Sequence, residues 1–421
     1  MTKRFSFSSG LVVGILMFTV FMSSCKPYRK VIPTDALVVV EVDVLELGMK
    51  SNILEQKDDI SRFIASIDPE NQFFQKLSNS IKKPRPSGIR MTQPVYFFVP
   101  SNGQDMFFTA AVRRKGKVIS TFQSFSKDIR IEETEHITWL FLKDKLIGAV
   151  TKKTLLLGSA RNKDVYHRLL TQKKGFFDTD ASNVMARNRG DVTTMVNLQH
   201  LSSDAKEVAE FAIEMIDSEE GDVNKTLKQL LNAQIVMSLK FESGHIAFNT
   251  RISGINNEHF FTKKIQPEDL QSIPNDHLLC VLALGTYQEN IQKAYGDLHT
   301  QLQTAINDYA LIQLPQDCQM HGEGNYCYFT HTSADAPTSS SFQKAQNAAS
   351  CYAYAYFDKA MINRLASNKE ELNKIKTSIL QVVDYAELKM KKGNQVSLLL
   401  HFTDKSQNAL ALIIKQIINS L

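Results

Sequence analysis

The sequence Ile32-Pro33-Thr34-Asp35, followed by the apolar run from Ala36 to Val44, predicts how the folded part of this chain begins. A proline turn that leads into a valine-rich run of this length is typical of a largely buried strand. The same phrase returns at Ile273-Pro274-Asn275-Asp276, ahead of the apolar run from Leu278 to Leu284. The similar strand behind both phrases favours an internal repeat over a chance recurrence.

Hairpin signals also recur along the chain. Alternation of apolar and polar residues places one face of a strand on the core, and glycine readily adopts the positive φ that a tight turn needs. Three segments combine two alternating strands with a turn glycine: Val95–Val112 around Gly103, Leu239–Ile252 around Gly244 and Leu388–Phe402 around Gly393.

Each predicted hairpin follows an apolar strand and a stretch of helical periodicity. The helical stretches lie at about 53–81, 205–231 and 359–383, and a fourth at 291–309 precedes the segment 318–329. Because helices bury their apolar stripes against a sheet, we expect an α+β protein of repeated strand-helix-strand-strand units. The units are expected to form antiparallel-rich sheets with helices on one face, in two similar halves.

The remaining segments complete the expected organisation. A three-strand meander is predicted over 137–157, loops over 183–190 and 332–350, and a closing helix over 410–421. The expected regions are a signal peptide (1–24), a tether (25–31), an N-terminal α+β region (32–182), a second repeat unit (183–270) and a C-terminal α+β region (271–421).

The first residues carry an export signal. Lys3 and Arg4 precede an apolar run from Leu11 to Phe21, which is the pattern of a secretory signal and is too short to cross a bilayer. The sequence Met22-Ser23-Ser24-Cys25 that follows resembles the lipobox of bacterial lipoproteins. That resemblance implies that Cys25 becomes the mature N-terminus and carries fatty acyl chains such as palmitate, which give stable membrane attachment. An ordinary signal peptide and a buried strand are the alternatives.

With its lipobox, its Ile-Pro-x-Asp entry to an apolar strand and its length, the chain resembles a family of large lipoproteins of Bacteroides-like bacteria. The family is defined by a domain of unknown function, so the resemblance implies a compartment and no chemistry. In such lipoproteins, acidic residues after the cysteine resemble a surface-export tag. Lys26 and Pro27 occupy those positions here. We therefore expect the periplasmic face of the outer membrane, with the lipid as the contact to the membrane.

The composition argues against a disordered chain and against a nucleic-acid-binding protein. Of the 421 residues, 43% are hydrophobic and 22% are charged, which is typical of a folded chain with a sizeable core. The formal net charge is +5, and loss of Lys3 and Arg4 with the signal leaves +3. No clustered basic face is evident, so no nucleic-acid partner is expected. The tether at residues 26–30 is locally basic. Beside the lipid it suits either contact with anionic headgroups or a solvated leader, and the solvated leader is favoured.

No motif for catalysis is present, so we expect a protein that is not an enzyme and has no cofactor. A phosphate loop, a Gly-x-Ser-x-Gly elbow and a His-Glu-x-x-His pair are all missing. His200, His245 and His277 lie beside predicted strands, where structural histidines are common. The adjacent pairs Glu132-Glu133 and Glu219-Glu220 point apart on any regular element, and this favours solvated surface over an acid–base pair.

The densest group of reactive side chains comprises Cys318, His321, Cys327 and His331. This spacing permits a zinc site, but periplasmic thiols tend to be oxidised. If Gly322 and Glu323 form a two-residue turn, Cys318 and Cys327 lie opposite each other, near disulfide distance. A Cys318–Cys327 disulfide is therefore favoured, with Cys280–Cys351 as the natural second bridge; buried thiols and metal binding remain as alternatives.

The aromatic residues leave further alternatives open. The alternating Tyr352, Tyr354 and Tyr356 suit either packing or a ligand platform, and packing is favoured.

The closing helix suits core packing better than a membrane surface. We expect non-enzymatic binding of a hydrophobic ligand or a protein partner, with an envelope-assembly scaffold as the alternative and a hydrolase as a weaker one.

Overall fold

The computed structural model describes residues 26–67, 72–82, 87–216, 228–254, 264–265, 270, 273, 278–284, 318–323, 326–331, 351–365, 379–391 and 394–419. It is a mixed helix and strand protein with extensive antiparallel sheet. The chain divides into two compact units, of which unit 1 comprises residues 1–39 and 86–183 and unit 2 comprises residues 40–85 and 184–421. Within the described helices, none has the length and apolarity that crossing a membrane requires.

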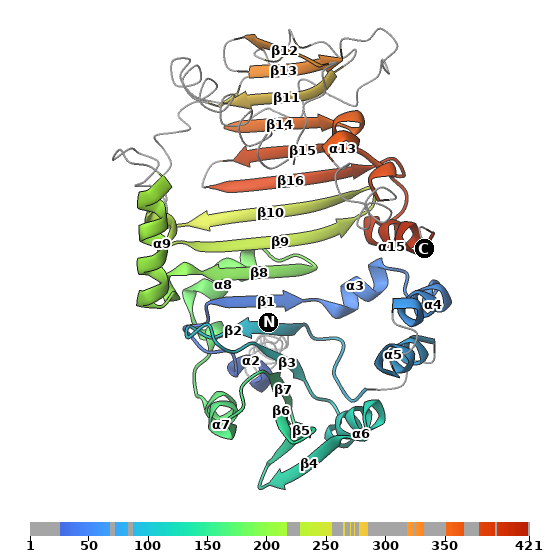
Figure 1. Cartoon of the computed structure of the whole chain (residues 1–421), viewed down its shortest axis with the longest axis vertical. Helices are drawn as coiled ribbons and strands as arrows, with labels where there is room; N and C mark the ends of the chain where they lie inside the picture. The colour runs from blue at the N-terminus through green and yellow to red at the C-terminus, as the bar shows by residue number, and fades with distance from the viewer. Residues whose placement is uncertain are drawn as a thin grey trace, which may run out of the picture. The chain divides into compact units, whose positions relative to one another are not determined.

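Unit 1 contains an antiparallel sheet in the order β2-β3-β7-β6-β5-β4 (Figure 1). Its strands are β2 (Val95–Val99), β3 (Phe107–Ala111), β4 (Ile129–Thr134), β5 (Ile137–Leu142), β6 (Lys145–Val150) and β7 (Thr154–Gly158), and its helices are α2 (Pro27–Lys30), α6 (Lys115–Phe125), α7 (Lys163–Thr171) and η1 (Phe176–Asp178). A buried cluster that includes Val118, Leu140 and Leu155 joins α6 to the sheet.

Unit 2 contains a longer antiparallel sheet in the order β12-β13-β11-β14-β15-β16-β10-β9-β8. Its strands are β8 (Val192–Asn197), β9 (Gln234–Glu242), β10 (His245–Ser253), β11 (Leu278–Leu284), β12 (Cys318–Glu323), β13 (Tyr326–His331), β14 (Ala353–Asp358), β15 (Val383–Lys391) and β16 (Gln395–Phe402). Strand β1 (Val38–Val42) and helix α8 (Asp180–Arg187) each span a boundary between the units.

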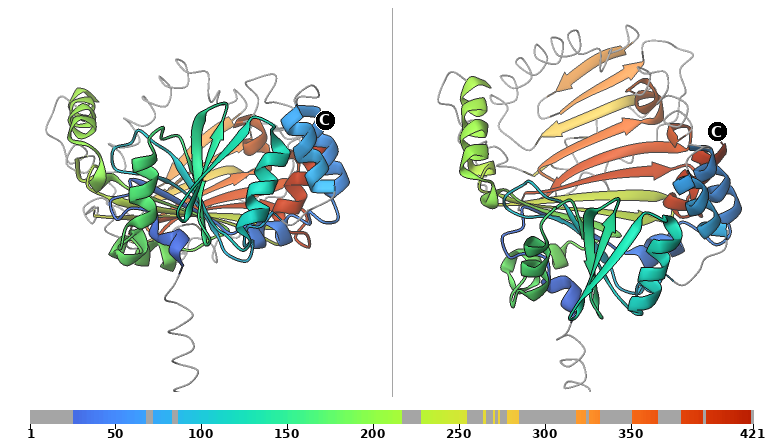
Figure 2. Two further views of the ribbon diagram at one scale, coloured as in Figure 1. Left: turned by 90° about the horizontal axis from the view of Figure 1, so that it is seen from below. Right: turned by 60° about the horizontal axis from the view of Figure 1, so that its bottom comes forward.

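Helices lie at both ends of the unit 2 strands. Figure 2 shows α9 (Ser203–Ile216) at one end, and α4 (Lys57–Ile67), α5 (Gln72–Lys82) and α15 (Ala409–Asn419) at the other. The remaining helices of the unit are α3 (Val44–Lys50), η2 (Leu198–His200) and α13 (Lys359–Leu365). Ala409 and Leu412 of α15 pack with Ile246, Val383 and Phe402, so the closing helix belongs to the core.

The opening strand is shorter and less buried than the sequence suggests. It ends at Val42, because the Asp43 side chain accepts a hydrogen bond from the Glu46 backbone N–H at 3.2 Å and caps helix α3. Val39 and Glu41 are buried, whereas the alternate residues are half-buried. The prediction of a largely buried strand from Ala36 to Val44 was therefore wrong in extent and burial.

Three further expectations need correction. The stretch 53–81 contains two helices, α4 and α5, rather than one. The predicted loop 183–190 is helical as far as Arg187, with Asp180 in the first turn and Arg187 in the last, which suits the helix dipole. The tether is folded, because α2 buries Tyr28 in unit 1.

The predicted hairpins are confirmed. β2 pairs with β3, β9 with β10, and β15 with β16. Gly103 and Gly244 have φ angles of +66° and +73°, and Asn394 has a φ angle of +58° in the third turn. The β5–β6–β7 meander and the β11 strand are also present as expected. Gly393, the helix at 291–309 and the loop at 332–350 lie outside the described residues.

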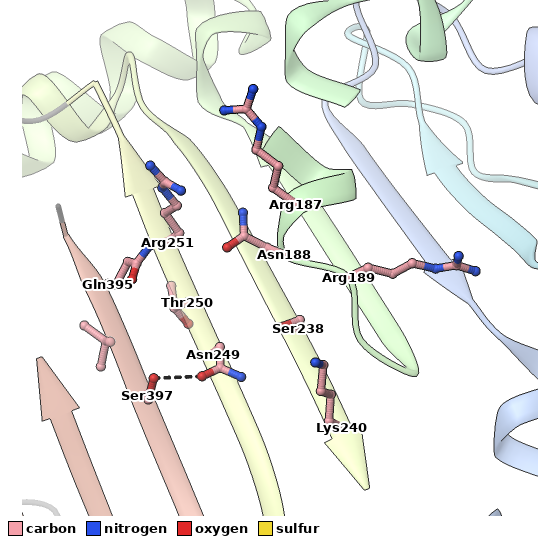
Figure 3. A pocket seen from close by; sticks show the side chains of 11 residues that line it. Arg187, Asn188, Arg189, Ser238, Lys240, Asn249, Thr250, Arg251, Gln395 and Ser397 are labelled. Atoms are coloured by element: carbon pink, nitrogen blue, oxygen red, sulfur yellow. Dashed lines mark hydrogen bonds between the residues drawn. The ribbon is translucent and has the colours of Figure 1, made fainter. Parts of the chain in front are cut away.

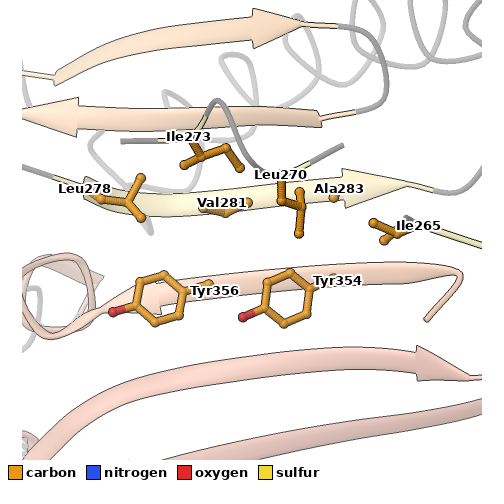
Figure 4. Close-up of a cluster of buried hydrophobic side chains, with 8 residues drawn as sticks. All are labelled: Ile265, Leu270, Ile273, Leu278, Val281, Ala283, Tyr354 and Tyr356. Carbon is orange, nitrogen blue, oxygen red and sulfur yellow. The ribbon is translucent and has the colours of Figure 1, made fainter. Parts of the chain in front are cut away.

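Buried aromatic residues fill the part of unit 2 around β11 and β14. Tyr354 and Tyr356 are 2% and 0% exposed, and they pack with Val281, Leu270 and Ile273 (Figure 4). For these two tyrosines the structure confirms packing over a ligand platform.

Candidate functional site

A polar groove lies on the unit 2 sheet beside the end of helix α8 (Figure 3). It has a volume of about 200 Å³ and is lined by the end of α8, the segment that follows it, and strands β9, β10 and β16. Its lining residues are mostly basic or hydrogen-bonding: Arg187, Asn188, Arg189, Ser238, Lys240, Asn249, Thr250, Arg251, Gln395, Val396 and Ser397.

Strand register explains why polar residues meet in the groove. Asn249 of β10 lies opposite Ser238 of β9 on one side and opposite Ser397 of β16 on the other. Directly opposed residues share a face of a sheet, so these side chains form a row. The Ser397 hydroxyl donates to Oδ1 of Asn249 at 2.7 Å, which orients the amide nitrogen of Asn249 away from that contact.

The charge of the groove is positive. Four lining residues are cationic and none is acidic. Arg189 turns away from the groove, and its guanidinium contacts Glu41 at 2.9 Å and Asp43 at 3.0 Å. Across the described ranges of the chain, no ion pair is recorded for Arg187, Lys240 or Arg251.

The segment that forms one wall of the groove is fixed to β9. The Asp191 carboxylate accepts from the Lys50 ammonium at 2.7 Å and from the Phe241 backbone N–H at 2.7 Å. At Gly190, a Cβ atom would lie 2.6 Å from the backbone oxygen of Leu239, so only glycine fits there. The groove is therefore largely preformed.

A buried charged network adjoins the groove on the same sheet. Lys389 of β15 lies opposite Ser397, and its ammonium contacts Oε2 of Glu387 at 3.0 Å. The Tyr354 hydroxyl donates to Oε1 of Glu387 at 2.8 Å, and Nε2 of His401 lies 3.4 Å from Oε2. The His401 ring stacks on Tyr385 with centroids 4.2 Å apart.

This network holds Glu387 in its ionised form. Burial raises the pKa of Glu387, but His401, Lys389 and Tyr354 together outweigh burial and lower the pKa. Burial and the nearby Glu387 carboxylate raise the pKa of Tyr354, and burial and Glu387 raise the pKa of Tyr385 to about 12. Through Tyr354, Glu387 and His401, the network joins strands β14, β15 and β16.

The structure corrects both predicted disulfide pairings. Cys318 lies opposite His331, and Cys327 lies opposite Gly322, because the β12 strand continues to Glu323. Cys280 lies opposite Phe357 of β14, six residues beyond Cys351, which corresponds to about 20 Å along a strand. A disulfide needs Cα atoms within about 7 Å, so a Cys280–Cys351 bridge is incompatible with this register. Cys351 is a buried thiol whose pKa is raised by burial.

The register also separates the four candidate metal ligands. Cys327 and His331 are four residues apart on β13, about 13 Å along the strand. That distance is too long for both to join Cys318 and His321 at one ion. Within the described residues, no group of three or more metal-binding side chains is found.

The histidines and glutamate pairs considered in the sequence either have structural contacts or lie outside the described residues. His200 ends η2, and His245 contacts Glu242 at 3.0 Å. Glu132 pairs with Lys163 and Arg130, whereas Glu133 bonds to Thr138 and Lys115, so this adjacent pair points apart as expected; these contacts lower the pKa of both glutamates. Cys25, His277 and the pair Glu219-Glu220 lie outside the described residues.

Sequence reasoning missed the basic residues of the groove. The sequence pattern makes Lys240 and Arg251 ordinary polar positions of alternating strands and predicts a loop at Arg187. The usable signal is that β9 and β10 place lysine and arginine on the same face as Ser238 and Asn249. Pairing with β16, which brings in Ser397 and Gln395, depends on a contact between segments about 150 residues apart.

Comparison with known proteins identifies a family and little else. The family model for the domain of unknown function DUF4836 matches residues 28–277. No curated protein matches the sequence. Among solved structures, crystal form I of TP0453 is similar with 10% identity and a TM-score of 0.32, covering 74% of this chain and 93% of that chain. Crystal form III of TP0453 gives 11% identity and a TM-score of 0.29, covering 72% and 92%. Similarity at these scores carries no argument about function.

Proposed function

The chain belongs to the DUF4836 family, and we propose that it is a non-enzymatic binding protein held at a membrane by a lipid on Cys25. In this proposal it is a lipoprotein of Bacteroides-like bacteria at the periplasmic face of the outer membrane. The groove of unit 2 takes an anionic group of the ligand.

The groove is the observation that carries the binding role. Arg187, Lys240 and Arg251 supply three positive charges, and Asn188, Asn249 and Gln395 add amide donors. Carboxylates, phosphates and sulfates are the groups that such a set of donors recognises. The volume of about 200 Å³ is below the usual range for drug-sized ligands and suits a single anionic group. The polar lining favours an anion over the hydrophobic ligand that the sequence suggested.

The membrane attachment rests on the sequence alone. A basic start, a short apolar run and Ser23-Ser24-Cys25 are the features of a lipoprotein signal. Incorporation of radiolabelled palmitate into the wild-type chain and its loss in Cys25→Ala tests the anchor. Protease treatment of intact cells tests the side of the membrane, and digestion there would overturn the periplasmic placement.

An internal repeat is part of the proposal, and the connectivity of unit 2 supports it. β8, α9 and the β9–β10 hairpin follow in the same order as β14, α13 and the β15–β16 hairpin. In both, the first strand pairs antiparallel with the first strand of its hairpin. The β11–β12–β13 set differs, because β11 pairs with the second hairpin strand, β13. We propose that the first two sets are copies of one unit.

An envelope-assembly scaffold is the second candidate. β12 ends the strand order of unit 2, so one of its edges has no strand neighbour among the described strands. An open edge can accept a strand from a partner. Crosslinking in cells that captures one stoichiometric protein would favour the scaffold.

A panel of small molecules tests the binding role directly. The midpoint of thermal unfolding is measured with phosphate, citrate, glucuronate, glucose and palmitate, because a ligand that binds only the folded state raises it. We expect stabilisation by at least one anion and none by glucose. Stabilisation by palmitate alone would overturn the anionic proposal in favour of a hydrophobic ligand.

A further inference from the structure

The first helix is part of the folded body of unit 1. Tyr28, Val31 and Ile32 are 1%, 2% and 0% exposed. The backbone oxygen of Tyr28 accepts a hydrogen bond from the Thr109 hydroxyl of β3 at 3.0 Å. The Arg29 guanidinium lies over the Phe177 ring, 4.8 Å from its centroid. The chain is therefore fixed to unit 1 from Pro27 onward.

This fixation limits the distance between a lipid on Cys25 and the protein. Only Lys26 separates Cys25 from the start of α2. Two extended residues span at most about 7 Å. If Cys25 is acylated, as proposed above, the surface of unit 1 around α2 must lie at the lipid headgroups.

That surface is basic. The segment after α7 packs on α2, since the side-chain amide of Gln172 donates to the backbone oxygen of Lys30 and the Phe176 N–H donates to the Ile32 oxygen at 2.8 Å. A Cβ atom at Gly175 would lie 2.7 Å from the Lys30 oxygen, so the contact is close. It brings Lys30 together with Lys173 and Lys174, and all three are exposed.

The neighbouring acidic residue, Asp178, does not neutralise the charge of these three lysines. Asp178 is the nearest acidic residue in the segment, and its carboxylate accepts a hydrogen bond from the Gly175 N–H at 2.9 Å. Lys30 and the segment 172–178 together contain three lysines and one acidic residue. Anionic headgroups attract lysines within a screening length of about 8–10 Å, and the short connection to Cys25 keeps the group inside that range.

We propose that the basic surface of Lys30, Lys173 and Lys174 docks on anionic phospholipid headgroups and orients unit 1 on the membrane that anchors Cys25. This proposal rests on the lipid anchor proposed above. The lipid provides attachment, and the three lysines fix which face of unit 1 meets the bilayer. Each lysine near an anionic surface strengthens the contact by about fivefold.

The test uses the full mature protein purified from membranes. The mass of its N-terminal peptide is measured first, and a peptide without acyl chains would overturn the anchor and this proposal together. The protein is then placed in vesicles with or without phosphatidylglycerol in phosphatidylcholine, and its lysines are acylated briefly with a water-soluble reagent. Lys152 and Lys153, an exposed pair in the β6–β7 turn of the same unit, serve as the control.

We expect Lys30, Lys173 and Lys174 to react at least about fivefold more slowly on phosphatidylglycerol vesicles than on neutral ones, while Lys152 and Lys153 react equally on both. Charge reversal by Lys173→Glu with Lys174→Glu should remove the protection of Lys30, and Lys152→Glu with Lys153→Glu should leave it. Equal reactivity on both kinds of vesicle, with the acyl chains present, would overturn the docking surface and leave the anchor standing.

Discussion

The hydroxyl group of Tyr354 donates a hydrogen bond of 2.8 Å to Oε1 of Glu387, and both residues are 2% exposed. The bond joins neighbouring strands β14 and β15 beside the basic groove. A buried carboxylate depends on each of its donors, because water cannot replace one that is lost.

Removing the Tyr354 hydroxyl tests this dependence. Tyr354→Phe leaves the packing of the ring in place but takes one donor from Glu387, so the free energy of unfolding should fall by about 1–3 kcal/mol. Tyr352→Phe, at a half-buried position just before β14, is the matched control and should change it by less than about 0.5 kcal/mol. Urea denaturation measures both. Equal stability of the two variants would show that the bond contributes little.

The ionised state of Glu387 makes stability depend on pH. Its pKa in the folded protein is lowered below the ordinary value of 4.5, so the unfolded chain takes up a proton more readily. The stabilisation is fully present above pH 4.5 and is lost as the pH falls through the folded pKa. Glu387→Gln should flatten this loss in acid, and Glu242→Gln, at a carboxylate that is 47% exposed, should not. Parallel acid profiles for wild type and Glu387→Gln would contradict the assignment.

Alanine substitutions at two glycines of unit 2 distinguish the free-energy cost of a strained backbone conformation from the cost of a steric clash. Gly244 and Gly254 both have positive φ angles, +73° and +93°. A Cβ atom at Gly244 would lie 2.7 Å from Cα of Lys405, whereas the nearest atom at Gly254 is 3.3 Å away. Gly254→Ala should cost about 1–2 kcal/mol from conformation alone, and Gly244→Ala should cost more. Urea midpoints decide the order, and the reverse order would show that the Lys405 segment moves freely.

Peptide mapping without reduction tests the strand register around the cysteines. The register of β11 against β14 places Cys280 opposite Phe357 and far from Cys351. Digestion of the native protein, with its thiols blocked first, should yield no peptide in which Cys280 is bonded to Cys351. Recovery of that peptide as the main species would mean that the two strands pair in another register.

Local sequence patterns predicted which segments form strands and hairpins better than they predicted which residues lie opposite each other. The glycine turns and alternating strands identified the hairpins, because turn and strand signals are local. The apolar run from Ala36 to Val44 hides the helix start at Asp43, although Asp43 and Glu46 have the spacing of one. The Cys318–Cys327 pairing failed because β12 continues to Glu323, which lies opposite Tyr326, and such a shift in register changes every opposed pair. The Cys280–Cys351 pairing failed because β11 pairs with β14 in a register that places Cys280 opposite Phe357.

The groove could not be predicted from one segment. Asn249 meets Ser397 only because β10 pairs with β16, and no local signal specifies which hairpins become neighbours. The loop expected at 183–190 also concealed that α8 positions Arg187 above the sheet. Without the α8 segment beside them, Lys240 and Arg251 look like ordinary polar positions on exposed strands.

Calorimetric titration of the mature protein with phosphate, citrate and glucuronate tests the proposed anionic groove most directly. The account predicts that at least one of these anions binds and that Arg251→Gln weakens the binding by about tenfold or more, the value of one charge-assisted hydrogen bond. Arg161→Gln, at an exposed position of unit 1, should leave the affinity unchanged. Absence of binding by all three anions, or binding that Arg251→Gln does not weaken, would contradict the account.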